Sequence, residues 1–384
     1  MTLNFIFKIF LAYKISKVEI GLFYTFMDMV AIGIMVFSGF KDSLIRAFDR
    51  ANFEVVVSWY FLSFWSLFLI VLIGEILYFT HNDFPYSVMI LLLLLFFNAL
   101  MIFLSYLNAA YKNYKIMLFE NLVATIGLLC IFFLSSLFIS NIYALVAAFI
   151  GSFLSKILFI YFNLPQKITF RWHRFNEDVK KFLRDTALSS SMYFFSGIFI
   201  SASGLMILKL FGDKIILAEY QVVVRSIFFS LVAIFVFPLN TFTFPQISKL
   251  VSSGMFEEIT RIEKILQKYL LLFFIVLLIG TFFTKYAITL VFPAEYSQSY
   301  VMLNTLLPLL PLLAYTTFAI NIVKSFDRFD LALVIRFTGA LLFFISIYIF
   351  YFLGYSAKSI VWSLDISFIA MFLLSVFYKK KLLG

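Results

Sequence analysis

Long uninterrupted runs of apolar residues dominate the pattern of hydrophobic and polar positions along this chain. Runs of about 18 or more residues recur from one end to the other, and each is long enough to cross about 30 Å of hydrocarbon as an α-helix. A transmembrane β-barrel would instead show segments of about ten residues that alternate between polar and apolar. Segments such as 89–97 are apolar on every face, so the pattern predicts helices.

These runs, read between clusters of charge, predict eleven full spans and a shorter apolar segment over residues 1–15. The predicted fold class is therefore an all-α polytopic membrane protein with about 12 transmembrane helices, of which the first is short. The full spans are expected at about 19–40, 55–79, 85–108, 118–139, 142–162, 185–209, 216–240, 267–290, 298–323, 331–353 and 357–377.

Composition and charge support the same class of protein. Hydrophobic residues make up 64% of the chain and charged residues 13%, whereas soluble domains have roughly 45–50% apolar and about 25% charged residues. Lysine and arginine collect in the loops of one side, 20 against 6 on the other, so we predict that this side and the C-terminus are cytoplasmic. The net charge of +10 then reflects topology and contact with anionic membrane lipids, and is no evidence for nucleic acid binding.

No constellation of catalytic residues is evident in the sequence. The two histidines, His81 and His173, lack the spacing of metal ligands, and no glycine-rich phosphate loop ends in Lys-Ser or Lys-Thr. We therefore expect no metal, no cofactor, no enzymatic activity and no transport driven by ATP. The single cysteine, Cys130, excludes an intramolecular disulfide, and Lys8 in the first apolar segment argues against a cleavable signal peptide.

Two long connections on the basic side organise the chain. The first predicts an N-terminal six-helix lobe over 1–165, a basic cytoplasmic linker over 166–184 and a C-terminal lobe over 185–384. The second, about 245–268, has the spacing of an amphipathic helix, which we expect to lie in the membrane interface as an anchor; coupling to a partner is the alternative. A faint repeat with an offset near 200 residues matches Gly21 to Asp28 with Ala218 to Arg225, and it supports two parallel halves.

Charges inside the spans are the most informative candidates, because each costs about 2.5–3.5 kcal/mol at a helix centre. Asp28 and Arg225 occupy equivalent positions of the repeat. We hypothesise that they pair in one state of a transport cycle and that Arg225 contacts an anionic substrate group in another; a static salt bridge is the alternative. Lys156 fits a tie to a neighbouring helix as well as a functional role. Other charges in spans are Asp365, which is deep, and Arg336, Glu75 and Lys209, which snorkelling to the headgroups explains.

One span is rich in serine. At 3.6 residues per turn, Ser189, Tyr193, Ser196 and Ser203 fall roughly on one face, which would suit the lining of a wet path. Close helix packing is the alternative, because serine and other small residues also serve contacts between helices in lipid.

Two stretches of the sequence resemble a known family. The first is Tyr13 to Phe23, followed by Gly39-Phe40 and then Ser43 to Arg46; the second is Ala218 to Arg225, followed by Phe237-Pro238 and then Phe244 to Leu250. Both look like the corresponding regions of Wzx-type flippases of polysaccharide (O-antigen) units, and the resemblance extends loosely over the whole chain. Such proteins belong to the multidrug, oligosaccharidyl-lipid and polysaccharide (MOP) exporter superfamily.

The resemblance implies two pseudo-symmetric six-helix lobes around a central cleft in the bacterial inner membrane. The implied cargo is an undecaprenyl-diphosphate-linked oligosaccharide, moved to the periplasmic leaflet by alternating access coupled to an ion gradient. Further implied partners are a polysaccharide polymerase and a chain-length regulator. Family members begin with a full transmembrane helix, so the short segment 1–15 is expected to be a truncated first helix.

The first two helices of each lobe line the cleft in this family, and they hold most of the candidates above. Ion coupling needs a titratable carboxylate inside a span, and the candidates are Asp28 and Asp365, with Asp28 preferred. The substrate-binding candidates are Arg225, Lys156, Ser189, Tyr193, Ser196 and Ser203.

Two other functions stay open at this point. A multidrug cation antiporter of the same superfamily would concentrate carboxylates in its cleft, whereas deep acids and bases are about balanced here. A membrane glycan polymerase would need a large outer loop with reactive arginine or histidine side chains, but the predicted outer loops are each only about ten residues or fewer.

Overall fold

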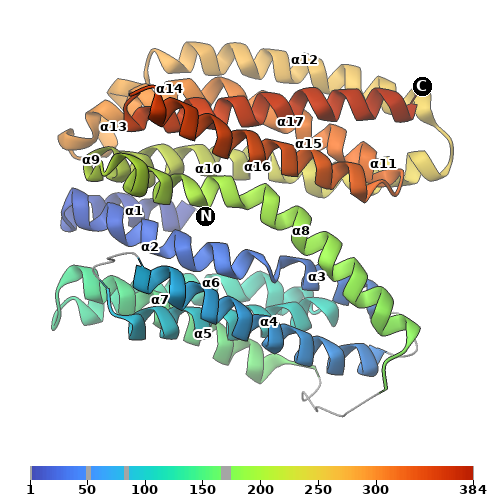
Figure 1. Ribbon diagram of the computed structural model, residues 1–384, viewed down its shortest axis with the longest axis horizontal. Coiled ribbons are helices and arrows are strands. Elements are labelled where there is room, and N and C mark those ends of the chain that lie inside the picture. Colours follow the sequence, from blue (N-terminus) through green and yellow to red (C-terminus); the bar gives the residue numbers. More distant parts are fainter. Residues whose placement is uncertain (1, 49–52, 82–85, 166–173, 384) are drawn as a thin grey trace. The chain divides into compact units, whose positions relative to one another are not determined.

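The computed structural model describes residues 2–48, 53–81, 86–165 and 174–383, and helices account for most of them (Figure 1). These ranges contain no β-strand, so the predicted all-α class is confirmed. Ten of the helices described are long and apolar enough to cross a membrane, or eleven if a pair bent by 65° is one span. That number agrees with the eleven full spans predicted, and the chain is a multi-pass membrane protein.

Internal contacts divide the chain into two compact units. Unit 1 consists of Met1–Thr25 with Ile198–Gly384, and unit 2 is Phe26–Gly197. The boundary crosses two helices, α2 (Lys17–Met35) and α8 (Glu177–Met206), so each of them contributes one part to each unit. The predicted lobes at 1–165 and 185–384 have different bounds from these two units and stay a prediction. Of the predicted linker 166–184, residues 166–173 lie outside the described ranges, and the part from Glu177 onward is the start of α8.

Unit 2 is a helical bundle in which α6 and α7 pack on each other and α5 packs on α7 (Figure 1). Aromatic rings fill its interior: Tyr60 stacks on Phe103 with ring centroids 4.8 Å apart, and Phe64 meets the same ring at 5.3 Å. Besides its parts of α2 and α8, the unit comprises α3 (Ser38–Ala47), α4 (Phe53–His81), α5 (Val88–Ala110), α6 (Tyr114–Ser135) and α7 (Asn141–Asn163).

Unit 1 contains the N-terminal helix and the second half of the chain. Two of its segments, η1 and η2, are π-helical, and three, η3 to η5, are 3-10 turns. Besides its parts of α2 and α8, the unit comprises α1 (Thr2–Lys14), η1 (Ile207–Phe211), α9 (Lys214–Ala218), η2 (Glu219–Val224), α10 (Arg225–Phe235), α11 (Phe237–Ser252), α12 (Phe256–Thr281), α13 (Thr284–Val291), η3 (Ala294–Ser299), α14 (Tyr300–Leu306), η4 (Leu307–Leu309), α15 (Leu310–Ser325), α16 (Phe329–Phe352), η5 (Ala357–Ser359) and α17 (Ile360–Leu383).

The segment predicted as one interfacial helix, about 245–268, is divided between two helices. Helix α11 ends at Ser252, Gly254 adopts a φ of +70°, and α12 begins at Phe256. Glycine suits this turn because it reaches positive φ without steric cost. The apolar residues of the segment also have a different partner from the one expected: Ile247 and Ile259 form a buried cluster with two residues of α15, Phe318 and Ile322. Their apolar side is therefore covered by protein and is not free to anchor in lipid.

Large apolar side chains remain exposed along the outside of many spans, including Ile70 on α4, Phe133 on α6, Leu272 on α12 and Phe377 on α17. Such a surface would be unfavourable in water but suits contact with lipid chains. The polar groups that are buried inside each unit therefore stand out as candidates for function.

Candidate functional site

A polar cluster inside unit 1 surrounds Arg225, the first residue of α10. The preceding segment, η2, is one π-helical turn, in which the N–H of Arg225 bonds to the carbonyl of Tyr220. π-helical turns are rare and frequent at functional sites. We call the group formed by Lys8, Thr25, Gln221, Arg225 and Ser226 the Lys8–Arg225 site; its residues come from α1, α2, η2 and α10.

Hydrogen bonds join the members of this site into one network. The guanidinium of Arg225 donates to Oε1 of Gln221 at 2.9 Å, and Nε2 of Gln221 donates to Oγ1 of Thr25 at 3.2 Å. The hydroxyl of Ser226 donates to the backbone carbonyl of Gln221 at 3.3 Å and accepts a hydrogen bond from Nζ of Lys8 at 3.0 Å. Thr25 and Gln221 are buried, at 0% and 1% exposure, so Arg225 is held from within the unit.

Aromatic rings flank both cations of the Lys8–Arg225 site. Nζ of Lys8 lies 4.4 Å from the ring centroid of Tyr24, and the guanidinium carbon of Arg225 lies 5.8 Å from that of Phe229. Cation–π contacts of this kind orient a cation without neutralising its charge. Hydroxyl, amide and aromatic groups are therefore among the partners of both cations, and a cation held in this way suits contact with an anion.

An ion pair lies near the start of the same helices. Nζ of Lys17 on α2 is 2.9 Å from Oε1 of Glu219 on η2 and donates to the carbonyl of Glu295 at 2.6 Å. The ring of Tyr296 lies 5.1 Å below the same ammonium group. These contacts fix the beginning of α2 to η2 and η3, and they help to explain why residues up to Thr25 group with unit 1.

The two predicted ion-coupling carboxylates belong to different units. Asp28 lies in unit 2 on α2 and is 4% exposed, and Asp365 lies in unit 1 on α17. Oδ1 of Asp365 is buried and has no hydrogen-bond partner among the described residues. Asp28 and Arg225 each follow the first residue of their own span by eleven positions, from Lys17 and from Lys214. Their pairing stays a prediction.

Lys156 lies in a tie between two helices of unit 2. Its ammonium group on α7 is 3.1 Å from Oε1 of Glu120 on α6 and donates to Oδ1 of Asn121 at 3.0 Å. Both partners of the ion pair have side chains that are about nine-tenths buried. Contact with a neighbouring helix is one of the two roles predicted for Lys156, and the structure shows it. The other role, contact with a substrate, stays a prediction.

The predicted serine face of α8 is divided between the units. Ser189, Tyr193 and Ser196 lie in unit 2 and Ser203 in unit 1. The hydroxyls of Ser196 and Ser203 donate to the carbonyls of residues 192 and 199 of the same helix, at 2.7 Å each. Ser189 is buried, whereas Tyr193 is 37% exposed.

Helix α3 packs closely on the first part of α8 in unit 2. The hydroxyl of Tyr193 donates to Asp42 at 2.7 Å, and the N–H of Gly39 donates to Oγ of Ser190 at 3.2 Å. A Cβ atom added at Gly39 would collide with the backbone of Ser190. Close packing therefore accounts for a small residue at position 190, next to the predicted Ser189.

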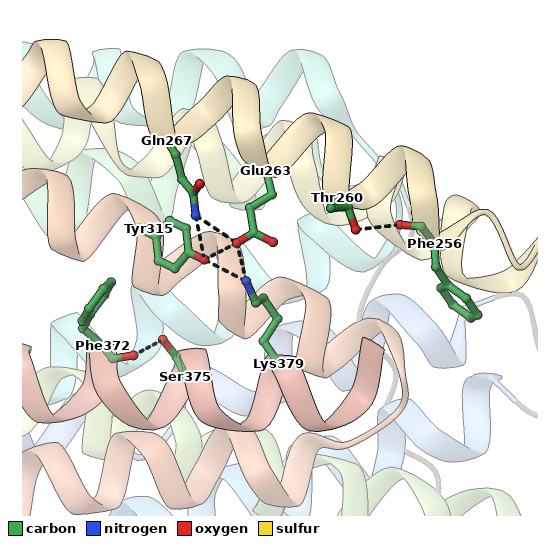
Figure 2. Close-up of polar contacts among 8 residues, drawn as sticks. All are labelled: Phe256, Thr260, Glu263, Gln267, Tyr315, Phe372, Ser375 and Lys379. Atoms are coloured by element: carbon green, nitrogen blue, oxygen red, sulfur yellow. Dashed lines mark hydrogen bonds and ion pairs between the residues drawn. The ribbon is translucent and has the colours of Figure 1, made fainter. Parts of the chain in front are cut away.

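A second buried polar cluster in unit 1 joins three helices (Figure 2). Oε1 of Glu263 on α12 accepts hydrogen bonds from Lys379 on α17, from the hydroxyl of Tyr315 on α15, and from Gln267 at 3.1 Å. Lys379 also donates to the hydroxyl of Tyr315 at 2.8 Å. The side chains of Lys379 and Glu263 are 5% and 12% exposed. This cluster fixes α12, α15 and α17 to one another.

Sequence reasoning missed several of these residues. Lys8 was noted only as an argument against a signal peptide, although a charge within an apolar helix is itself a signal of function. Glu263 falls within the predicted interfacial helix and Lys379 within the predicted cytoplasmic C-terminus, so the sequence does not predict their contact. No group of three or more His, Cys, Asp or Glu residues that could hold a metal ion occurs in the described part of the chain.

Comparison with known proteins finds similarity in structure only. No protein-family model and no curated protein sequence matches this chain. An inward-facing multidrug resistance MATE family transporter of the MOP superfamily aligns with a TM-score of 0.75 and 13% identity, over 99% of this chain and 94% of that chain. The lipid II flippase MurJ in an inward closed conformation aligns with a TM-score of 0.73 and 15% identity, over 98% of this chain and 85% of that chain.

A MOP superfamily transporter from Pyrococcus furiosus aligns with a TM-score of 0.64 and 15% identity, over 100% of this chain and 91% of that chain. These alignments cover 85% or more of each of the three solved chains. The sequence identities are too low to assign the function of those proteins to this chain. The chain therefore has the fold of the transporters of the MOP superfamily.

Proposed function

We propose that this protein is a flippase of the Wzx type. It moves undecaprenyl-diphosphate-linked oligosaccharide units from the cytoplasmic to the periplasmic leaflet of the bacterial inner membrane, with its C-terminus in the cytoplasm. The observation that carries the proposal is the Lys8–Arg225 site, in which two cations on two apolar helices have hydroxyl and amide groups among their hydrogen-bond partners.

The chemistry of the cargo explains why such a site is needed. A diphosphate with attached sugars cannot cross about 30 Å of hydrocarbon unaided, because every unpaired polar group costs several kcal/mol there. Guanidinium and ammonium groups replace the water around the diphosphate, and Arg225 presents a fork of donors that matches phosphate oxygens. The polyprenyl chain stays in lipid throughout.

The remaining candidates have complementary roles in this proposal. Asp28 is the coupling carboxylate, with Asp365 as the second candidate, since an ion gradient drives transport through a group that binds the ion with different affinity in the two conformations. Tyr193 and the serines of α8 offer hydroxyls to the sugars. A polysaccharide polymerase and a chain-length regulator are the proposed downstream partners.

The similarity in fold to a lipid II flippase supports this class of cargo. A multidrug transporter is the second candidate, because the MATE structure aligns with a slightly higher TM-score than the flippase. The two differ in the charge that they need. A diphosphate needs cations such as Lys8 and Arg225 at its binding site, whereas a cationic drug needs carboxylates.

The test uses cells that lack the gene, restored with the wild-type chain or with a Lys8→Gln/Arg225→Gln double variant. Lipid-linked oligosaccharide is quantified, and a glycan-cleaving probe confined to the periplasm reports whether it can be reached. We expect intact units to accumulate out of reach in the deletion and in the double variant, and to become accessible with the wild type. Units that stay accessible without the gene would refute the flippase, and an accompanying change in drug sensitivity would favour the multidrug transporter.

A further inference from the structure

Three buried lysines in the described helices each pair with a glutamate on another segment. In every pair both side chains are at most 12% exposed, and the lysine and carboxylate offset the cost of removing each other from water. The pairs are Lys17 with Glu219, Lys156 with Glu120 and Lys379 with Glu263.

Arg336 on α16 differs from these lysines. It follows the first residue of its helix, Phe329, by seven positions, which places it about 10 Å along the span at 1.5 Å per residue. Its one hydrogen bond in the described structure runs from Nη1 to the sulfur of Met371 on α17, at 3.8 Å. No carboxylate of the described residues pairs with it. A thioether is a weak acceptor, so most of the guanidinium donors have no hydrogen-bond partner among the described residues.

The surroundings of Arg336 form a narrow seam between α16 and α17. A Cβ atom added at Gly339 would lie 2.7 Å from the sulfur of Met371, and Ser367 donates to the carbonyl of Gly339 at 2.8 Å. The two helices are therefore in close contact one turn beyond Arg336. Arg336 itself is only partly buried, and Val334 on α16 and Leu373 on α17 have exposed apolar side chains that suit contact with lipid.

A guanidinium in this position needs an anion, because a cation inside a span is costly unless a partner neutralises it. The partner must come from outside the described protein, must reach a partly exposed guanidinium between two helices with lipid-facing sides, and must offer oxygen acceptors to a planar fork of donors. A phosphate group meets all three conditions. We infer that Arg336 binds a phosphate group of a membrane lipid in the seam between α16 and α17.

Two lipids share this chemistry: an anionic phospholipid, through its headgroup, and a polyprenyl diphosphate. The inference holds for the first whatever the protein transports, whereas the second source rests on the proposed function. The experiment therefore offers both lipids to the purified full chain in an uncharged detergent. The probes are phosphatidylglycerol and undecaprenyl diphosphate, with diacylglycerol as the reference without phosphate, and native mass spectrometry measures how much of each is retained.

We expect the wild type to retain at least one of the phosphate lipids over diacylglycerol, and Arg336→Gln to lower that retention about tenfold, the effect of losing one charged hydrogen-bonding partner. The matched control is Arg328→Gln, because Arg328 precedes the same helix but is exposed and bonds to Asp330. Its retention should equal that of the wild type. Equal retention by wild type and Arg336→Gln, or an equal loss in Arg328→Gln, would overturn the inference.

A second variant separates lipid binding from a structural role. Arg336→Met removes the charge and keeps an apolar side chain beside Met371, so without added lipid it should melt at the same temperature as the wild type or higher. A lower melting temperature would make Arg336 a structural tie and overturn the inference. Preference for undecaprenyl diphosphate over phosphatidylglycerol would assign the site to cargo, and the reverse preference would assign it to phospholipid. The phospholipid result would stand even if the flippase proposal failed.

Discussion

Gly21 on α2 lies directly against Ala218 on α9. A Cβ atom added at Gly21 would be 2.8 Å from Cα of Ala218 and 2.9 Å from its Cβ. The two residues are 197 positions apart and are the equivalent residues of the predicted repeat. Equivalent residues meet when two similar segments pack around a local two-fold axis, so the contact supports the repeat from within unit 1.

Replacing Gly21 by alanine should destabilise the protein by about 1–3 kcal/mol, because the added methyl group forces the backbones of α2 and α9 apart. The measurement is thermal unfolding of the purified protein in detergent. Gly74→Ala on α4 is the matched control: nothing lies within 4 Å of a Cβ atom there, so it should be neutral or stabilising by up to about 1 kcal/mol. Equal melting temperatures for Gly21→Ala and wild type would contradict the close contact.

Removing one member of the Glu263–Lys379 pair should be strongly destabilising. Glu263→Gln or Lys379→Met leaves the other charge buried without its partner, a change that costs about 3–5 kcal/mol in buried pairs. The double variant should recover most of that loss, because neither charge remains. The three variants are compared by thermal unfolding, and a double variant no better than the single ones would mean that the ion pair does not couple α12 to α17.

Arg261→Gln provides the control for that series. Arg261 lies on the same helix two residues before Glu263, and its guanidinium is 3.7 Å from Glu258 in an exposed pair. Exposed pairs three or four residues apart on a helix contribute roughly 0.2–0.5 kcal/mol, so this variant should unfold close to the wild type.

The spans could be predicted from the sequence because the thickness of the bilayer fixes their length and composition. Which helices pack on one another could not be predicted from the sequence. The buried ion pairs depend on this packing. Glu219, Glu120 and Glu263 lie 202, 36 and 116 positions from the lysines that they contact, and nothing in a linear pattern selects those partners.

The prediction of a single interfacial helix at about 245–268 was wrong for a different reason. The spacing of its apolar residues indicates an apolar side but not whether lipid or another helix covers that side. In the structure, α15 covers it. The break within it had a local signal. Ser253-Gly254 is a dipeptide typical of turns, and Gly254 adopts positive φ.

The Lys156–Glu120 pair offers a way to separate a structural tie from a substrate role. Lys156→Met and Glu120→Gln should each destabilise unit 2, and the double variant should regain stability because no unpaired charge is left. Transport is then measured in the double variant with the periplasmic probe. Transport that returns with stability makes Lys156 a tie, whereas a stable but inactive double variant would mean that its charge meets the substrate.

Arg225 is expected to act on the cargo through its charge and its geometry. Arg225→Ala should lower transport about ten- to hundredfold, the effect of losing hydrogen bonds from a charged group worth about 1.5–3 kcal/mol. Arg225→Lys keeps the charge without the fork and should be intermediate. Gln221→Leu, which removes the side chain that orients the guanidinium, should resemble Arg225→Lys. Full transport by both Arg225 variants would remove Arg225 from the substrate site.

Asp28 should carry the dependence of transport on the ion gradient. It is buried in a span, where a carboxylate is costly when charged, so binding of a proton or a small cation should change with conformation. Asp28→Asn mimics the neutral form permanently. We expect the variant to lose the response of the transport rate to external pH or to the sodium gradient, whichever drives the wild type in liposomes.

Asp365→Asn, tested in parallel, should keep that response. Loss of coupling in Asp365→Asn alone would move the coupling site to α17, and an unchanged response in Asp28→Asn at every pH would remove Asp28 from the coupling mechanism.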